Sequence, residues 1–96
     1  MTAVNVVRFR VKPGMDQTFL AAHRGGKVAW PGLRRGVIVD AGEQSYFLVG
    51  EWPDMPTLAA ARAPMIATLD TFRHALEDLG HGVTDAVSGM VTLSLK

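Results

Sequence analysis

The chain has 96 residues, no cysteine and a net charge of +1 from ten basic and nine acidic side chains. This near-neutral balance excludes the strongly basic face of a nucleic-acid-binding domain, and the missing cysteines exclude disulfides, thiolate metal sites and cysteine nucleophiles. No apolar run approaches the roughly 20 residues that a membrane-spanning helix needs, and the first residues lack the pattern of a secretory signal. We therefore expect one cytoplasmic domain over residues 1–96 that binds neither nucleic acid nor membrane.

The first third of the sequence predicts a strand followed by a helix. Over residues 3–12, alternation predicts a strand with one mostly apolar face, which would pack on helices and carries Asn5, Val7, Phe9 and Val11. Pro13-Gly14 ends this strand. A helix follows over residues 15–29, and its apolar stripe is Met15, Phe19, Ala22, Gly26, Ala29 and Trp30. His23 lies at the edge of that stripe, and Gly25-Gly26 predicts a bend or a close approach to the sheet.

The middle of the sequence predicts a hairpin and a short helix. A short turn joins strands over residues 33–41 and 45–52, which is typical of an antiparallel pair. Asp54 is placed to cap a helix over residues 55–62.

The last third predicts a longer helix and a final strand. Pro64 would break the preceding helix and fits the first turn of the next. That helix is expected over residues 65–79, with an apolar stripe of Met65, Leu69, Phe72, Leu76 and Leu79. The final strand is expected over residues 86–95, with one face formed by Val87, Val91, Leu93 and Leu95.

This order predicts a ferredoxin-like β-α-β-β-α-β sandwich of the α+β class, with four antiparallel strands in one sheet. Helices would cover one face of the sheet and leave the other open. The open face would carry apolar residues of the last strand together with Val4, Val6, and Tyr46 or Phe47. We expect a partner to cover so apolar a face.

Three stretches carry a resemblance to a known family: "VRFRVKPGMDQTFL", "WPGL" and "YFLVGEWPDMPTL". They resemble the antibiotic biosynthesis monooxygenase-like group of the dimeric α+β barrel superfamily, and the match loosens after Arg62. The resemblance implies a homodimer in which two sheets face each other as a barrel, with a pocket between sheet and helices in each subunit. It also implies a small apolar or aromatic ligand, because members include cofactor-free oxygenases of polycyclic phenols or quinols. Other members degrade haem, isomerise their substrates or have no known reaction.

The haem-degrading branch of that group is characterised by an Asn on the first strand and by a Trp and a His in the second helical region. Aligned at the Pro-Gly turn, this chain has Val7 at the Asn position and Asn5 two residues earlier. Aligned at Glu51-Trp52, it has Ala61 near the Trp position. The chain departs from that branch, so we predict no haem or other cofactor. We also predict no metal site, because its three histidines show no metal-ligand spacing.

His23 and Asn5 are the candidate catalytic residues. An imidazole is suited to remove a phenolic proton near neutral pH, but His23 could equally be a partly exposed side chain bonded to water or backbone. Asn5 lies on the apolar face of its strand, where a buried amide needs partners. It could be a satisfied structural amide, or it could orient a carbonyl or hydroxyl of a ligand.

The expected pocket between sheet and helices is lined by large apolar side chains. The candidate substrate-binding residues are Phe9, Phe19, Trp52, Met65 and Phe72. Three functions stay open: a cofactor-independent monooxygenase acting on a quinol- or polyphenol-type molecule, a non-catalytic dimeric module that binds a small ligand or serves in stress, or a structural role with no ligand.

Overall fold

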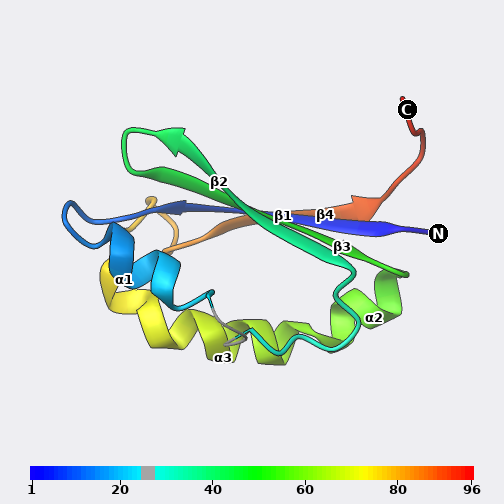
Figure 1. The fold of residues 1–96 in the computed structure, drawn as a ribbon, viewed down its shortest axis with the longest axis horizontal. Helices are drawn as coiled ribbons and strands as arrows, with labels where there is room; N and C mark the ends of the chain where they lie inside the picture. The colour runs from blue at the N-terminus through cyan, green and yellow to red at the C-terminus, as the bar shows by residue number, and fades with distance from the viewer. Residues whose placement is uncertain (25–27) are drawn as a thin grey trace.

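A computed structural model describes residues 1–24 and 28–96. One four-stranded antiparallel sheet forms the first layer, and helices cover one of its faces (Figure 1). The strands are β1 (Ala3–Arg10), β2 (Arg35–Gly42), β3 (Ser45–Trp52) and β4 (Asp85–Met90), in the spatial order β2-β3-β1-β4. The helices are α1 (Asp16–Ala21), α2 (Met55–Ala60), α3 (Arg62–Phe72) and the short 3₁₀-helix η1 (Arg73–Ala75). This is the ferredoxin-like α+β sandwich that the sequence predicts.

The face of the sheet under the helices holds the core. Strand β3 alternates strictly, and its Tyr46, Leu48, Gly50 and Trp52 are all buried there. From β1, Ala3, Asn5 and Phe9 are buried on the same face, as the alternation predicts. The rings of Phe9, Phe19 and Phe72 form the centre of the core, with centroids 5.2 to 5.7 Å apart.

The described helices all lie on one side of the sheet, and none of them covers the opposite face (Figure 1). A row of four valines crosses every strand there, since Val37 pairs with Val49, Val49 with Val6, and Val6 with Val87. Phe47 also lies on this face, whereas Tyr46 lies under the helices. This settles which of the two aromatic residues belongs to the open face.

The helix expected over residues 15–29 is wrong in length, because α1 ends at Ala21. Beyond it, the His23 and Arg24 amides bond to the carbonyls of Leu20 and Ala21, three residues back, so the chain leaves the helix in a tight turn. Trp30 is buried but lies outside any helix. The predicted bend at Gly25-Gly26 lies outside the described residues.

The helix expected over residues 65–79 is also wrong at both ends. It begins at Arg62, with Pro64 in its first turn, and gives way to η1 after Phe72. Leu76 is then extended and pairs with Val11, flanked by backbone hydrogen bonds from Lys12 to Ala75 and from Glu77 to Arg10. Pairing with the end of the first strand overrides the helical period.

The last strand is shorter than expected and ends at Met90, rather than near residue 95. The Val91 amide still bonds to the Thr2 carbonyl, and the C-terminal segment then departs from the sheet on the side away from the helices (Figure 1). Leu93 and Leu95 are 74% and 93% exposed. Among the described residues, no helix has the length and apolar character to cross a membrane.

Candidate functional site

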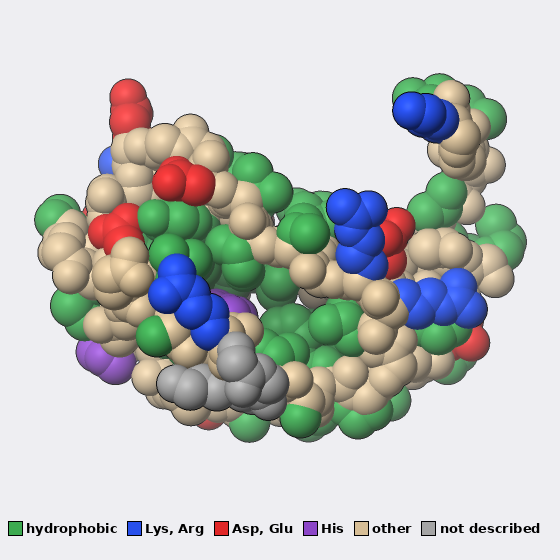
Figure 2. Space-filling view, viewed as in Figure 1, with side chains coloured by type: hydrophobic (Ala, Val, Ile, Leu, Met, Phe, Trp, Pro, Cys, Tyr) green, Lys and Arg blue, Asp and Glu red, His purple; other side chains and the backbone are tan. Residues whose placement is uncertain are grey.

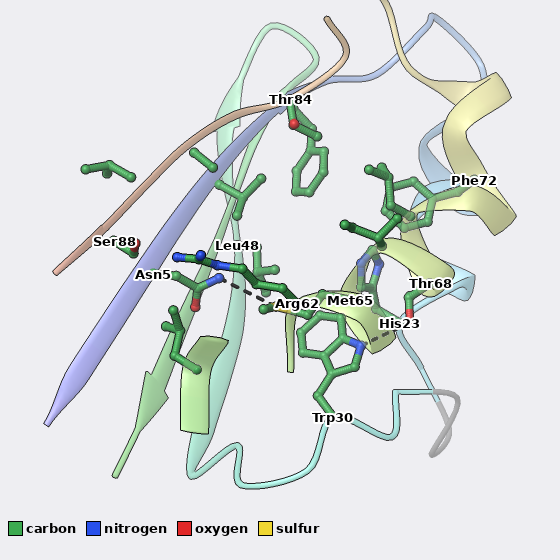
Figure 3. Close-up of a pocket in the computed structure, with 17 residues that line it drawn as sticks. Asn5, His23, Trp30, Leu48, Arg62, Met65, Thr68, Phe72, Thr84 and Ser88 are labelled. Atoms are coloured by element: carbon green, nitrogen blue, oxygen red, sulfur yellow. Dashed lines mark hydrogen bonds between the residues drawn. The ribbon is translucent and has the colours of Figure 1, made fainter. Parts of the chain in front are cut away.

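A cavity of about 340 Å³ lies between the sheet and the helical layer. Its volume is at the small end of the roughly 300–1,000 Å³ of ligand pockets. Figure 2 shows the hollow between the two layers with hydrophobic side chains inside it. Figure 3 shows the side chains that line the cavity, which include Asn5, His23, Trp30, Leu48, Arg62, Met65, Thr68, Phe72, Thr84 and Ser88.

Asn5 lies on the cavity side of β1 and is 6% exposed. Its Oδ1 accepts a hydrogen bond of 2.8 Å from Trp52 Nε1, and among the described residues its Nδ2 donates only to the thioether of Met65 at 3.7 Å. A thioether is a weak acceptor. The carbonyl half of the amide is therefore fixed by Trp52, and the NH₂ half is available to a better acceptor.

Gly50 makes this arrangement possible. It is directly opposite Asn5 on β3, and a Cβ there would overlap with Asn5 Oδ1 and lie 3.0 Å from Trp52 Nε1. A glycine in a strand interior often marks such a close approach.

His23 lies in the turn after α1 and is half-buried on the cavity wall. Its Nδ1 lies 2.9 Å from the carbonyl oxygen of Phe19. A carbonyl only accepts, so Nδ1 carries the proton and the neutral ring keeps its lone pair on Nε2. Burial lowers the pKa of His23 below its ordinary value, although the bond to Phe19 opposes this. The ring packs against Phe72, with centroids 4.8 Å apart.

The bond to Phe19 also explains why the helix stops here. In a longer helix the Phe19 carbonyl would accept the His23 backbone amide. Here that carbonyl accepts the His23 ring, while the backbone amide turns to Leu20. The same side chain therefore ends α1 and is held in one tautomer.

The structure brings together most of the predicted site residues. Asn5 and His23 line one cavity, together with Phe9, Met65 and Phe72. Phe19 and Trp52 do not belong to the described lining, and both are 0% exposed. They lie behind the wall, where Phe19 supports the His23 ring and Trp52 holds Asn5.

Several lining residues were not among the sequence predictions. Trp30 donates a hydrogen bond of 3.0 Å from Nε1 to Thr68 Oγ1, which fixes the indole over the cavity. Arg62 reaches the cavity from the start of α3, and Thr84 and Ser88 reach it from the β4 side. The sequence offered one signal for Ser88, which is a polar residue adjacent to Val87 and so on the other face of the last strand; its position directly opposite Asn5 comes from the structure.

A second polar pair lies outside the cavity lining. Tyr46 donates a hydrogen bond of 2.6 Å from its hydroxyl to Asp16 Oδ2, which ties α1 to β3. This bond lowers the pKa of Asp16 and, together with burial, raises the pKa of Tyr46 to about 12. Among the described residues, no three His, Asp or Glu side chains gather closely enough to hold a metal ion.

No protein-family model matches the chain, and a sequence comparison with the curated proteins finds no significant match. Solved structures do match. SnoaB, a cofactor-independent oxygenase from Streptomyces nogalater, is 16% identical with a TM-score of 0.69, and the match covers 98% of this chain and 96% of that one. A protein from Nitrosomonas europaea, named as a candidate antibiotic biosynthesis monooxygenase, is 18% identical with a TM-score of 0.75, over 95% and 90% of the two chains.

Similarity of this kind is not confined to oxygenases. A protein of unknown function from Nitrosomonas europaea is 13% identical with a TM-score of 0.77, over 97% and 91% of the two chains. These structures confirm the resemblance to the antibiotic biosynthesis monooxygenase-like group, and at such identities the similarity is one of fold. The chemistry must be argued from the cavity.

Proposed function

We propose that the protein is a cofactor-independent monooxygenase that acts on an aromatic molecule of the quinol or polyphenol type. The observation that carries the proposal is His23: a ring with its proton held on Nδ1 and its lone pair on Nε2, in the wall of an aromatic cavity. SnoaB, a cofactor-independent oxygenase of the same fold, supports this choice of reaction class.

In the proposed reaction, Nε2 of His23 removes a proton from the activated carbon or hydroxyl of the bound substrate. The resulting anion supplies the electrons that reduce oxygen. For an anthrone-type substrate, the ring CH₂ and O₂ become a ring C=O and one water, so the substrate carbon provides all four electrons that reduce O₂ and no external reductant is needed. The proton taken by His23 leaves with that water, and the low pKa of the ring favours its return to the neutral form.

The cavity would favour this reaction by binding and by excluding water. Phe9 and Phe72 contribute aromatic side chains to the lining, which suits an aromatic ligand. The NH₂ group of Asn5 is free to replace Met65 with a ligand oxygen, which would hold the developing negative charge. In this proposal Asn5 positions the substrate and His23 accepts its proton.

Oxygen consumption tests the proposal directly. With a panel of anthrones and quinols, the wild type should exceed the uncatalysed rate, and His23→Ala should lower turnover by about 10²- to 10⁴-fold. His74→Ala is the matched control, because His74 is exposed on η1 and outside the described lining. Equal rates for the wild type and His23→Ala would remove His23 as the base.

A second function is a non-catalytic module that binds a small apolar ligand in the same cavity. One observation favours it: Asn5 is already partnered on both sides, as a structural amide would be. Saturable binding of aromatic compounds without oxygen uptake would support this function over the first.

We further propose that two copies pair through the open sheet face. The valine row offers apolar area that needs covering, with Val37 38% and Val87 68% exposed. Charged pairs of both signs flank the row, Arg35 beside Glu51 and Arg8 beside Asp85. A copy related by a two-fold axis can meet such a face with opposite charges. Light scattering should give the mass of a dimer at micromolar concentration, and a monomer would contradict this proposal.

The cytoplasmic location stays a prediction.

A further inference from the structure

The formal charge carried by the described lining of the cavity is positive. Arg62 is charged and lines the cavity, whereas none of its described lining residues is acidic. Arg62 is exposed, and it takes part in none of the ion pairs found among the described residues. At the other charged candidate, His23, burial favours the neutral ring. In the described lining, the cavity therefore presents the cation of Arg62 without a carboxylate to neutralise it.

At the end of the cavity toward which Arg62 extends, the other polar side chains can donate hydrogen bonds. Within the described part of the chain, Asn5 Nδ2 has only the thioether of Met65 as its partner. Ser88 is the direct cross-strand neighbour of Asn5 and lines the same cavity. In Figure 3 the Arg62 side chain extends from α3 toward the end of the cavity at which Asn5 and Ser88 are drawn. A guanidinium group with further N–H and O–H donors is suited to bind an oxyanion.

The opposite end of the cavity is aromatic and close to neutral. Trp30 is fixed there by Thr68, and His23 and Phe72 pack against each other. A ligand that used the whole cavity would therefore place an apolar ring system at the His23 end and a polar, negatively charged group at the Arg62 end.

We propose that the ligand of this cavity is an aromatic oxyanion, a ring system bearing a carboxylate, and that Arg62 binds its anionic group. This inference rests on the proposed function for the position of the ring system, and it adds the charge of the substrate. Arg62 acts as a specificity-determining residue: it selects anionic over neutral rings and sets which end of the ligand faces His23.

Binding of two matched probes tests the proposal without any turnover. Naphthoate and the neutral, nearly isosteric naphthamide are titrated into the wild type, Arg62→Gln and Arg62→Lys. The wild type should bind naphthoate about 10- to 100-fold more tightly than naphthamide, as expected for a hydrogen-bonded charge pair. Arg62→Gln should abolish this preference and leave naphthamide binding unchanged, while Arg62→Lys should restore part of it.

The control is Arg73→Gln, which removes the same charge from an exposed arginine outside the described lining. It should keep the full preference for naphthoate. Equal binding of the two probes by the wild type, an unchanged preference in Arg62→Gln, or no saturable naphthoate binding up to millimolar concentration would each overturn the proposal. Tighter binding of naphthyl phosphate than of naphthoate would overturn the choice of a carboxylate.

Oxygen consumption on the same samples separates this inference from the proposed function. If no phenol is consumed but the Arg62-dependent preference is present, the oxygenase proposal fails and the anion site stands. If neutral anthrones are consumed in a His23-dependent way and the preference is missing, the anion site fails and the oxygenase stands.

Discussion

The two faces of the sheet are made by the same strands but carry different kinds of residue. On β1, Asn5 and Phe9 face the helices and are almost fully buried, whereas Val6 between them faces outward. The covered face combines large rings with a few polar groups that are satisfied and held in place. The outer face is a plain row of valines. Because neighbouring residues of a strand point to opposite faces, the same strand contributes to a surface that can position a ligand and to a surface suited only to being covered.

The first prediction tests the difference between the two faces by removing an aromatic ring from the covered face. Phe19 is 0% exposed and lies within 5.3 Å, between ring centroids, of Phe9, Tyr46 and Phe72. Phe19→Ala should lower the free energy of unfolding by about 3–5 kcal/mol, measured by urea denaturation at fixed protein concentration. Val39→Ala, at an outer-face position that is 44% exposed in one subunit, should cost less than about 2 kcal/mol even where a second copy covers this face. Similar losses for both variants would contradict the assignment of the two faces.

The second prediction tests the outer face by placing a charged side chain in the valine row. Val6 is near its centre, flanked by Val49 and Val87. Val6→Asp would bury a carboxylate between two copies, so the dimer should dissociate while each subunit stays folded. Light scattering should then report half the mass, with an unchanged circular dichroism spectrum. Gln17→Asp adds the same charge to an exposed position on α1 and should leave the dimer intact.

Sequence patterns predicted the covered face well where each segment settles its own structure. Strand β3 runs from Ser45 to Trp52 as expected, because a short turn before it and a proline after it mark both of its ends. Asp54 caps α2 as expected, with its carboxylate accepting the Thr57 amide at 2.8 Å. These signals are local, and no distant contact opposes them.

The patterns failed where burial comes from distant contacts. Trp30 continued the apolar stripe of the first helix, but it is buried by its bond to Thr68 and not by helical packing. Leu76 continued the stripe of the last helix, but it is buried as a strand partner of Val11. Arg62 looks like any exposed cation in the sequence, and only the tertiary fold places it at the cavity. Periodicity predicts that a residue is buried, and it does not predict which element buries it.

The third prediction concerns the hydrogen bond under the cavity. Asn5→Leu removes the acceptor of Trp52 Nε1, a buried donor. The loss should lower the free energy of unfolding by about 1–3 kcal/mol. Gly50→Ala should act in the same direction, because its new Cβ would displace Asn5 Oδ1. Ser88→Ala, opposite Asn5 but exposed, should change stability little. A neutral effect of Asn5→Leu in urea denaturation would show that the bond does not contribute.

The last and smallest effect is the pH dependence that His23 brings to the covered face. Burial lowers its pKa below 6.5, so around that pH the unfolded chain binds more protons than the folded one. The contribution of neutral His23 to stability is complete above pH 6.5 and is lost as the pH falls toward the lowered value. The pKa values of Asp16 and Asp54 are both lowered from 3.8, so their contributions are lost only in more acidic solution. Between about pH 5 and 7, His23→Gln should therefore reduce the slope of stability against pH. In an NMR titration more than half of the His23 rings should be neutral at pH 6.5, and a midpoint at or above 6.5 would contradict the effect of burial on this ring.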